Sequence, residues 1–378
     1  MTDSSPRRLL IAASGTGGHV FPAVAIAEQL ARSSHPWHLE WLGVPDRMEV
    51  KLVGDRYPLH TVKVAGFQGK PGLGTLKTLF RLIVSIGTVR TILKRGKFDG
   101  VFTTGGYISA PAILAAKSLG LPVVLHESNA LPGKVTRTFA PWCNVVAIGF
   151  QAAATHLKAK TVWTGTPVRS QFLQAASEVD DLRIPAGVRV VAMVGGSQGA
   201  VALNQLVRQC APAWFKQGIW LVHQTGESDA DAKTLRHPQY ISLPFYSNMA
   251  GLLNRADLVI SRSGAGTLTE LAMVGVPSIL VPYPFAAEDH QAYNAKVFVE
   301  AGAAEMFRQQ QLLPETLEAT VLDLLSTTPE ATARYDHMRS AAKSLAVVDS
   351  ATQVANLLEQ VVGHKASTNR SPSSKRSF

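Results

Sequence analysis

The sequence predicts an α/β protein made of two doubly wound, Rossmann-like domains with a ligand cleft between them. Short apolar runs alternate with segments of helical periodicity, which is typical of parallel sheets covered by helices on both faces. The alternation starts again after about residue 165. Glycine-rich turns follow strands in both halves, and sheets of this kind bind ligands at the carboxyl ends of their strands.

The first half reads as strand and helix in turn. Pro22 falls in the first turn of a helix, where its missing N–H has no partner to lose. The expected strands are residues 8–13, 38–42, 59–64, 100–103 and 122–126, and the expected helices are residues 22–32, 47–53, 75–94 and 111–119. Residues 161–167, which contain Gly165 and Pro167, are interpreted as a hinge.

The second half repeats this order. Its expected strands are residues 188–194, 220–224, 240–243, 258–261 and 278–281, and its helices begin at residue 201 and span 249–254, 267–274, 291–301 and 314–326. We therefore expect an N-terminal domain of residues 1–164 and a C-terminal domain of residues 165–348. A helix within residues 349–363 is expected to pack back on the N-terminal domain, and residues 364–378 to form a disordered basic tail.

The composition excludes several classes of protein. The two cysteines, Cys143 and Cys210, lie far apart without a CxxC pair, which argues against a disulfide framework or a zinc site and suits a reducing cytosol. No apolar run approaches the roughly 18 residues of a membrane span. The short run before Gly15 reads as a first strand and not as an export signal. If this protein meets a membrane, we expect it to lie on the surface.

The formal charge of +10 is unevenly distributed. Such a basic balance indicates nucleic acid, anionic lipid or a phosphorylated substrate as a partner. Besides the tail, one long stretch between Asp55 and Asp99 contains no acid. Its basic residues are Arg56, Lys63, Lys70, Lys77, Arg81, Arg90, Lys94, Arg95 and Lys97. Because the stretch is also unusually apolar, a solvated surface explains it only in part.

Three glycine-rich turns each follow a strand and open a helix: residues 14–19, 195–200 and 261–267. Glycine lets the backbone approach a phosphate, and the helix start adds unpaired N–H groups and the positive end of a dipole. One such turn is common in α/β sheets. Three, spread over both halves, favour a nucleotide diphosphate as the ligand.

Other nucleotide sites match less well. The turn at Gly15 lacks the third glycine of the dinucleotide fingerprint, although Glu40 stands near the end of the second strand at the spacing typical of NAD binding. No P-loop sequence is present. Asp229-Ala230-Asp231 has the DxD spacing of metal-dependent sugar transferases, but it lies in a polar run and not at the end of an apolar strand. Without a metal, helix N-termini and cationic or hydroxyl side chains must balance a departing diphosphate. The candidates are Ser197, Ser263, Thr267 and Arg169.

From the first glycine turn onward, the chain resembles a known family. The segment Gly15-Thr16-Gly17-Gly18-His19-Val20-Phe21-Pro22 is similar to the N-terminal signature of the MurG glycosyltransferases of bacterial peptidoglycan synthesis. Further similar segments are 41–43, 46–49, 105–107, 126–129, 165–169, 195–200, 262–267 with Glu270, and 290–291 with 294–295. The resemblance runs from about Leu9 to Val361 and leaves the tail outside.

The resemblance implies a GT-B fold and transfer of N-acetylglucosamine from UDP-N-acetylglucosamine to the C4 hydroxyl of the muramoyl sugar of lipid I. This reaction gives lipid II with inversion and requires neither a metal nor another cofactor. The implied partners are UDP-N-acetylglucosamine, a polyprenyl-diphosphate-linked muramoyl-pentapeptide and an anionic membrane surface, without nucleic acid. The implied location is the cytoplasmic face of the plasma membrane, as a peripheral protein.

In the first half, the resemblance places Thr16, Gly17 and Gly18 beside the donor sugar and the acceptor diphosphate, and Asn129 on the donor sugar. This chain departs from the family's frequent pattern at three positions, which hold Ser128, Thr166 and Gln68 in place of Gln, Asn and Arg. The first two changes are expected to be neutral. The third weakens the expectation of acceptor contacts in that loop.

Around the second half, the resemblance implies that Arg169 and Ser197 face the UDP phosphates and that Gln291 binds the donor sugar. The backbone of Tyr246 is expected near the uracil. The segment expected to wrap the nucleotide is Ala265, Gly266, Thr267, Leu268, Thr269 and Glu270, with Glu270 accepting from the ribose hydroxyls.

An inverting transfer needs a base for the acceptor proton and a site that stabilises the departing UDP. His19, at the mouth of the first glycine turn, is a candidate base, or else it caps the turn or contacts the acceptor diphosphate as a cation. Glu127 is the rival base, whereas the adjacent His126 is interpreted as structural. Tyr107 is expected to assist catalysis or to contact the acceptor.

The expected helix 75–94 combines an apolar face, which includes Leu79 and Phe80, with Lys77 and Arg81 one turn apart. Core packing explains part of that face. A basic amphipathic helix also binds anionic lipid headgroups, each cation contributing about 1 kcal/mol. We predict that this helix docks on the membrane that holds the polyprenyl acceptor.

Other functions stay open from the sequence. A related GT-B transferase acting on another lipid, such as diacylglycerol, would share the donor half, although residues 15–22 and 105–107 favour the peptidoglycan acceptor. A UDP-sugar epimerase, an NAD-dependent dehydrogenase and a non-catalytic membrane or nucleic-acid binder are the further alternatives. Against nucleic acid, aromatic residues that stack on bases are not interleaved with the charges.

Overall fold

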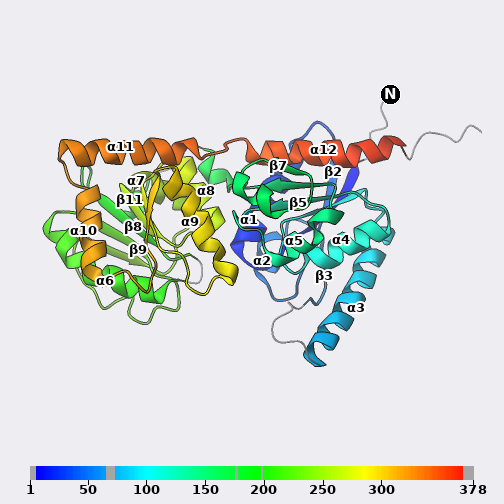
Figure 1. Cartoon of the computed structure of the whole chain (residues 1–378), viewed down its shortest axis with the longest axis horizontal. Helices are drawn as coiled ribbons and strands as arrows, with labels where there is room; N and C mark the ends of the chain where they lie inside the picture. Colours follow the sequence, from blue (N-terminus) through cyan, green and yellow to red (C-terminus); the bar gives the residue numbers. More distant parts are fainter. Residues whose placement is uncertain (1–5, 65–72, 175–177, 197–198, 369–378) are drawn as a thin grey trace, which may run out of the picture. The chain divides into compact units, whose positions relative to one another are not determined.

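The computed structural model describes residues 6–64, 73–174, 178–196 and 199–368. The chain divides into two compact units (Figure 1). Unit 1 comprises Met1–Arg169 and Asp349–Phe378, and unit 2 comprises Ser170–Val348. The first crossing from unit 1 to unit 2 therefore follows Arg169, whereas the sequence analysis places it after residue 164.

Unit 1 contains a seven-stranded parallel sheet in the order β3-β2-β1-β4-β5-β6-β7. The strands are β1 (Arg7–Ala12), β2 (Trp37–Gly43), β3 (Leu59–Thr61), β4 (Gly100–Thr103), β5 (Val123–Glu127), β6 (Val145–Ile148) and β7 (Thr161–Trp163). The chain leaves β1 toward β2 on one side and returns to β4 on the other, so the strand order reverses between β1 and β4. Such a switch point opens a crevice at the carboxyl ends of the two strands.

Helices cover both faces of this sheet, as its buried apolar strands require. The helices α3 (Leu73–Arg95) and α4 (Ser109–Ser118) pack on one face. The other face carries α1 (Gly17–Leu30), α2 (Met48–Val53) and the last helix, α12 (Ser350–Thr368). Val354 and Leu358 of α12 are fully buried there beside Ile26 of α1, which fixes α12 on unit 1.

Unit 2 repeats the same topology with a six-stranded parallel sheet in the order β10-β9-β8-β11-β12-β13. Its strands are β8 (Val190–Val194), β9 (Trp220–Gln224), β10 (Tyr240–Leu243), β11 (Leu258–Ser261), β12 (Ser278–Leu280) and β13 (Ala304–Met306). Its helices are α6 (Val201–Lys216), α7 (Met249–Arg255), α8 (Ala265–Val274), α9 (His290–Glu300), α10 (Pro314–Leu324) and α11 (Pro329–Ser344). The strand order reverses between β8 and β11, so this sheet has a switch point of its own.

The two doubly wound sheets confirm the predicted fold class, but several elements differ from the prediction. Strands β6 and β13 and helices α5 (Lys134–Phe139) and α11 were not predicted. The predicted hinge begins with strand β7, which pairs with β6 at the edge of the sheet. Helix α1 begins at Gly17 and not at residue 22, and α12 continues to Thr368, so residues 364–368 of the predicted disordered tail are helical.

Candidate functional site

At the switch point of unit 1, two turns hold His19 in one orientation. β1 leads into the turn before α1, and β4 leads into the turn before α4. The imidazole Nδ1 lies 2.7 Å from the carbonyl oxygen of Thr104, and the Thr104 hydroxyl donates to the carbonyl of His19 at 2.9 Å. Gly105 and Gly106 have φ values of +90° and +76°, and a Cβ on either would lie 3.4 to 3.6 Å from the ring. Glycine therefore lets the turn lie flat against the imidazole.

This arrangement sets the chemistry of His19. Because a carbonyl oxygen only accepts, Nδ1 carries the proton and Nε2 carries the lone pair of the neutral ring. Among the described residues, Nε2 has no hydrogen-bond partner. The ring is half-buried, so this nitrogen can accept a proton from a bound hydroxyl or, once protonated, contact an anion.

The glycine turn is also held by a buried acid that the sequence analysis named only as part of a similar segment. The carboxylate of Glu49 on α2 accepts hydrogen bonds from the backbone N–H groups of Gly15, at 3.2 Å, and Val44, at 2.8 Å. Glu49 is fully buried. It thereby ties the turn after β1 to the segment after β2. The spacing of Glu49 from the turn carries no sequence signal of this contact.

Phe21 connects the glycine turn with Arg169. A Cβ on Gly17 would lie 2.7 Å from the Phe21 ring, so the ring can occupy this place only beneath a glycine. The guanidinium carbon of Arg169 lies 5.2 Å from the ring centroid, within the range of a cation–π contact. Arg169, predicted to face phosphates, is thus oriented by a side chain of α1. Thr16 precedes Gly17 as the N-cap residue and is exposed, with its carbonyl accepting from His19 and Val20.

Glu127, the rival base, is buried and uses both carboxylate oxygens within its own loop. Oε1 accepts from the backbone N–H and the side-chain amide of Asn129, at 3.0 and 2.9 Å. Oε2 accepts from the N–H of Gly133 at 3.2 Å. These bonds fix the loop after β5 and orient Asn129, so the geometry favours a positioning role for Glu127.

His126 and Tyr107 differ sharply in exposure. His126 is fully buried, and its Nε2 lies 3.0 Å from the carbonyl oxygen of Gly165. Burial lowers the pKa of His126, which keeps the ring neutral and suits the structural role expected for it. Tyr107 follows Gly106 with 47% of its surface exposed, so its phenol can meet a ligand at this edge.

At the switch point of unit 2, the turns after β8 and β11 lie side by side, because Val194 and Ser261 are partners in the sheet. The hydroxyl of Ser263 donates to the carbonyl of Gln291 at 2.8 Å and is buried, so it is not available to a phosphate. The side-chain oxygen of Gln291 accepts from the N–H of Tyr283 at 2.9 Å, which leaves its NH₂ group to reach a ligand. Ser197 lies outside the described residues.

Helix α8 begins at this edge with Gly264 as its N-cap residue. Its first N–H groups have no carbonyl partner within the helix, so they can bind an anion. Gly266, Thr267 and Glu270 are half-buried, whereas Ala265 and Leu268 are buried. The Thr269 hydroxyl donates to the Ala265 carbonyl at 2.9 Å. Leu268 lies in the core, so only its backbone is available to a nucleotide.

Tyr246 is buried in unit 2, and its hydroxyl donates to Asp181 at 2.8 Å. Burial, together with this acceptor, raises the pKa of Tyr246 to about 12. The phenol is thus engaged with Asp181, which leaves the backbone of Tyr246 for the role predicted for it. The preceding residue, Phe245, has 60% of its surface exposed and can stack on a base. The sequence analysis missed Phe245, because an aromatic residue carries no periodic signal in a loop.

Glu40 and Asp229 suggested NAD binding and metal binding in the sequence analysis. Both are engaged in ion pairs. Glu40 is the middle residue of β2, three residues from either end, and its carboxylate contacts Arg8, His38 and His60. It is therefore not presented at the strand end, where NAD-binding proteins place an acid on the ribose. Asp229 of the DxD sequence pairs with Arg208 at 2.8 Å. In the described part of the chain, no group of three or more His, Cys, Asp or Glu residues is placed to hold a metal.

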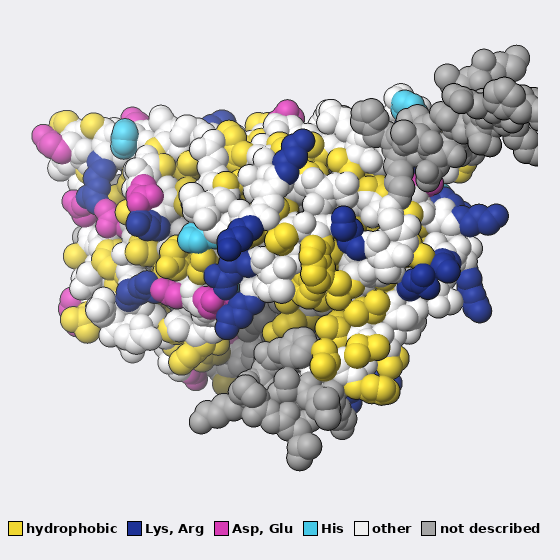
Figure 2. All heavy atoms as spheres, turned by 45° about the vertical axis from the view of Figure 1, so that its right-hand side comes forward, with side chains coloured by type: hydrophobic (Ala, Val, Ile, Leu, Met, Phe, Trp, Pro, Cys, Tyr) yellow, Lys and Arg dark blue, Asp and Glu magenta, His cyan; other side chains and the backbone are white. Residues whose placement is uncertain are grey.

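The two parts of helix α3 differ in how far their side chains are buried. Toward its end, Val89 and Leu93 are buried against α4 and the sheet. Earlier in the helix, Leu79, Phe80, Ile83 and Val84 are exposed, Phe80 with 66% of its surface. Figure 2 shows hydrophobic side chains gathered at the lower right, where α3 lies, with Lys and Arg side chains on the same face. Arg81 is exposed, and the side chain of Lys77 lies outside the described part. No helix of the described residues is long and apolar enough to span a bilayer.

Most of the chain is similar to known proteins. Residues 9–148 match the glycosyltransferase family 28 N-terminal domain, and residues 190–354 match the glycosyltransferase family 28 C-terminal domain. The chain is 59% identical over 361 residues to a protein of Trichormus variabilis, covering 95% of this chain and 99% of the relative. It is 58% identical over 362 residues to a protein of Trichodesmium erythraeum, covering 96% and 94%. Both relatives are named UDP-N-acetylglucosamine–N-acetylmuramyl-(pentapeptide) pyrophosphoryl-undecaprenol N-acetylglucosamine transferase.

Among solved structures, MurG of Acinetobacter baumannii superimposes with a TM-score of 0.76 at 30% identity, covering 94% of this chain and 100% of that one. The chain belongs to the MurG family of glycosyltransferases. This result confirms the resemblance found in the sequence, the GT-B fold and the assignment as a hexosyltransferase. The two matches to glycosyltransferase family 28 include all three glycine turns, the first in the N-terminal domain and the other two in the C-terminal domain.

Proposed function

We propose that this protein transfers N-acetylglucosamine from UDP-N-acetylglucosamine to the C4 hydroxyl of the muramoyl sugar of lipid I, forming lipid II for peptidoglycan. The strongest support is similarity over nearly the full length to transferases named for this donor and this acceptor. In this proposal, unit 2 binds the UDP-sugar and unit 1 binds the acceptor. This assignment is supported by the strand orders, because each sheet has its own switch point.

His19 is the proposed base. Its Nε2 removes the proton of the acceptor hydroxyl while the acceptor oxygen attacks the anomeric carbon from the face opposite UDP. The bond from the anomeric carbon to the phosphate oxygen breaks, and that oxygen leaves with the electron pair. The hydrogen bond from Nδ1 to the Thr104 carbonyl stabilises the imidazolium that forms. Glu127 contributes by holding Asn129 toward the donor sugar.

The charge of the departing UDP needs backbone N–H groups and cationic or hydroxyl side chains to stabilise it. The proposed groups are the N-termini of α6 and α8, the Arg169 guanidinium and the hydroxyls of Thr267 and Ser197. Glu270 accepts from the ribose hydroxyls, and Gln291 donates to the sugar. Thr16, Gly17, Gly18 and Tyr107 contact the acceptor and the donor sugar in unit 1.

We further propose that α3 places unit 1 on the cytoplasmic face of the plasma membrane, as a peripheral protein without nucleic-acid partners. The exposed Leu79, Phe80 and Ile83 would enter the headgroup region, and Arg81 with Lys77 would contact anionic lipids. The acceptor is anchored in the bilayer by its polyprenyl chain, so this contact concentrates the enzyme where its substrate lies.

An acceptor comparison tests the proposal. Purified protein is incubated with UDP-N-acetylglucosamine and either a synthetic lipid I analogue or diacylglycerol, each with and without EDTA. We expect a disaccharide product with the lipid I analogue alone, at the same rate in EDTA. Glycosylation of diacylglycerol alone would replace the proposed acceptor, and loss of transfer in EDTA would overturn only the metal-free mechanism.

A further inference from the structure

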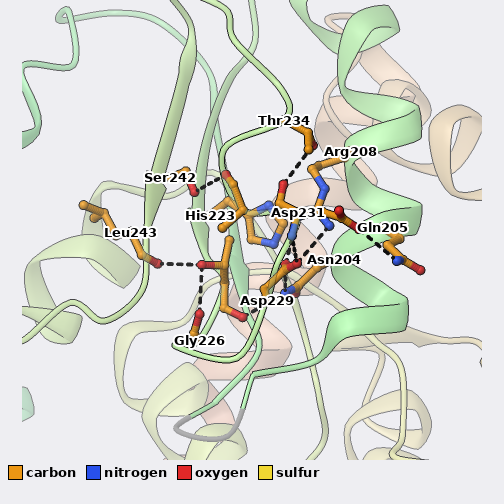
Figure 3. Close-up of polar contacts among 12 residues, drawn as sticks. Asn204, Gln205, Arg208, His223, Gly226, Asp229, Asp231, Thr234, Ser242 and Leu243 are labelled. Carbon is orange, nitrogen blue, oxygen red and sulfur yellow. Dashed lines mark hydrogen bonds and ion pairs between the residues drawn. The ribbon is translucent and has the colours of Figure 1, made fainter.

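A buried ion pair in unit 2 is unused by the proposed chemistry. Asp229 and Arg208 are both more than nine-tenths buried. Figure 3 shows them next to Asn204 and Asp231. Asp229 Oδ2 accepts from Arg208 Nη1 at 2.8 Å and from the Asn204 amide at 2.6 Å. Its Oδ1 accepts from Arg208 Nη2 at 3.2 Å and from the N–H of Asp231 at 3.0 Å. Both oxygens of the first carboxylate of the DxD sequence are thus directed at protein donors.

The same cluster reaches the glycine turn that precedes α6. Asn204 lies in the first turn of α6, and its amide also donates to the carbonyl of Thr225 at 2.8 Å. That carbonyl oxygen lies 2.7 Å from the place where a Cβ on Gly199 would stand. Gly199 has a φ of +73°, a backbone conformation that favours glycine. The loop after β9 therefore presses directly on the turn, in a place fixed by Asn204.

The surroundings of the cluster favour a single charge state. Although burial opposes ionisation, hydrogen bonds from Arg208 and Asn204 keep the pKa of Asp229 below its ordinary value. Burial and the nearby Arg208 charge lower the pKa of His223 to about 3, so its ring is neutral. The Tyr240 hydroxyl lies 3.0 Å from His223 Nδ1. Arg208 and Asp229 therefore balance each other, and loss of either leaves an unpaired charge in the interior.

We infer that the Arg208–Asp229 pair positions Gly199 and the N-terminus of α6, acting through Asn204 and the Thr225 carbonyl. This inference rests on the proposed function, because it assigns the N-terminus of α6 to the UDP diphosphate. Neither charged residue touches the ligand. Their effect is on the direction of backbone N–H groups, and hydrogen bonds to a phosphate weaken steeply when those groups turn away.

A positioning role differs from simple stabilisation in what it changes. General loosening of unit 2 would weaken the binding of every part of the nucleotide. Displacement of Gly199 and the N-terminus of α6 instead weakens the binding of UDP while leaving that of uridine nearly intact. The ratio of the two affinities therefore separates the roles.

The chain supplies a matched control at the opposite end of the same sheet. Arg189 Nη1 lies 2.8 Å from Asp257 Oδ1, and Asp257 Oδ2 accepts from the N–H of Val190 at 2.8 Å. This pair joins the beginnings of β8 and β11, whereas the Arg208–Asp229 cluster lies beyond the strand ends. Asp257→Asn removes an ion pair from unit 2 without touching the glycine turn.

The experiment measures KM and kcat for UDP-N-acetylglucosamine, and the affinities for UDP and uridine, in wild type, Asp229→Asn, Arg208→Lys and Asp257→Asn. We expect Asp229→Asn to raise KM and to weaken the affinity for UDP by about tenfold. Losses of this size are seen when a residue that orients a metal ligand is mutated. Uridine affinity should change less than about twofold. Asp257→Asn should lower the melting temperature and leave both affinities as in wild type.

Equal weakening of UDP and uridine, or an unchanged KM with a lower melting temperature, would overturn the inference. If Asp229→Asn does not fold, the same affinities are compared between wild type and Arg208→Lys. This variant keeps the charge but loses the bidentate contact with Asp229. A wild-type protein that binds UDP without transferring the sugar would defeat the proposed function. The ratio of UDP to uridine affinity would still decide the role of the cluster.

Discussion

At the scale of single residues, His19 is the side chain whose chemistry the surrounding backbone determines. Its partner, the Thr104 carbonyl, lies 85 residues away in the sequence. Pairing of β1 with β4 brings His19 and Thr104 together, and Gly105 and Gly106 let the turn after β4 lie flat against the ring. The sequence placed His19 at the mouth of the turn, but the direction of its proton-accepting nitrogen depends on this distant contact.

If His19 is the base, His19→Ala should lower kcat by roughly 10²- to 10⁴-fold, the usual contribution of a positioned base. UDP affinity should stay near the wild-type value, because the phosphates are proposed to bind elsewhere. Steady-state transfer and UDP titration measure the two quantities, with the exposed His35→Ala as control. A His19→Ala enzyme that keeps half its kcat would exclude this role.

Phe21 gives a second prediction at this scale, because its ring contacts the Arg169 guanidinium. Phe21→Leu should raise the KM for UDP-N-acetylglucosamine about threefold to tenfold, from the loss of roughly 1 kcal/mol of cation–π energy. Phe21→Tyr keeps an aromatic face and should restore the wild-type KM. Equal KM values in all three proteins would show that the contact does not orient Arg169 for the donor.

At the scale of elements, α3 joins two roles along one helix. Its later turns complete the core of unit 1, while its earlier turns expose a row of large apolar side chains. The amphipathic pattern predicted the helix but did not show where core packing ends. That division depends on α4, which covers only part of the length of α3 (Figure 1).

Membrane binding by α3 can be measured by sedimentation with anionic vesicles. Arg81→Glu combined with Lys94→Glu should release the protein, because each reversal replaces an attraction of about 1 kcal/mol by a repulsion. Charge reversal at the exposed Lys216 and Lys233 of unit 2 is the control and should leave binding unchanged. If only the control variant is released from the vesicles, the membrane contact lies on unit 2 and the prediction is wrong.

Elements without a clear apolar pattern escaped prediction for identifiable reasons. Helix α11 buries only Ala331, Met338 and Ala342, so its sequence shows no apolar stripe. Strands β7 and β13 are short and lie at the edges of their sheets. Short edge strands are defined by their pairing partners more than by their own sequence.

At the scale of the whole molecule, each unit contains a buried histidine that stays neutral in the folded state. Burial lowers the pKa of His126 in unit 1, and burial with the Arg208 charge lowers that of His223 in unit 2 to about 3. The unfolded chain takes up a proton at each site below about pH 6.5. The stability that this difference provides is fully present above that pH and is lost as the pH falls toward the folded-state pKa values.

We therefore predict that the melting temperature falls on acidification from about pH 7.5 to pH 5.5, with His223 contributing about 1.4 kcal/mol and His126 acting in the same direction. His223→Gln should flatten this pH dependence, whereas His35→Gln, at an exposed position, should not. Differential scanning calorimetry follows both variants. A pH dependence that is identical in His223→Gln and wild type would show that His223 is not the responsible group.

The two-unit architecture was predictable because parallel sheets leave a strong pattern: apolar strands, intervening helices and glycine turns at strand ends. The clustering of Asn204, Arg208 and Asp229 was not, since it joins one helix face to a polar loop. The same limitation made the DxD sequence resemble a metal site. Only the fold shows that its first carboxylate is buried against an arginine.

Release of UDP from UDP-N-acetylglucosamine, followed with and without the lipid I analogue, provides the sharpest test of acceptor-dependent transfer. We predict negligible release without the analogue and, with it, one UDP for each disaccharide formed. UDP release that is independent of the acceptor, or conversion of the sugar nucleotide without any disaccharide, would contradict the proposed transferase function.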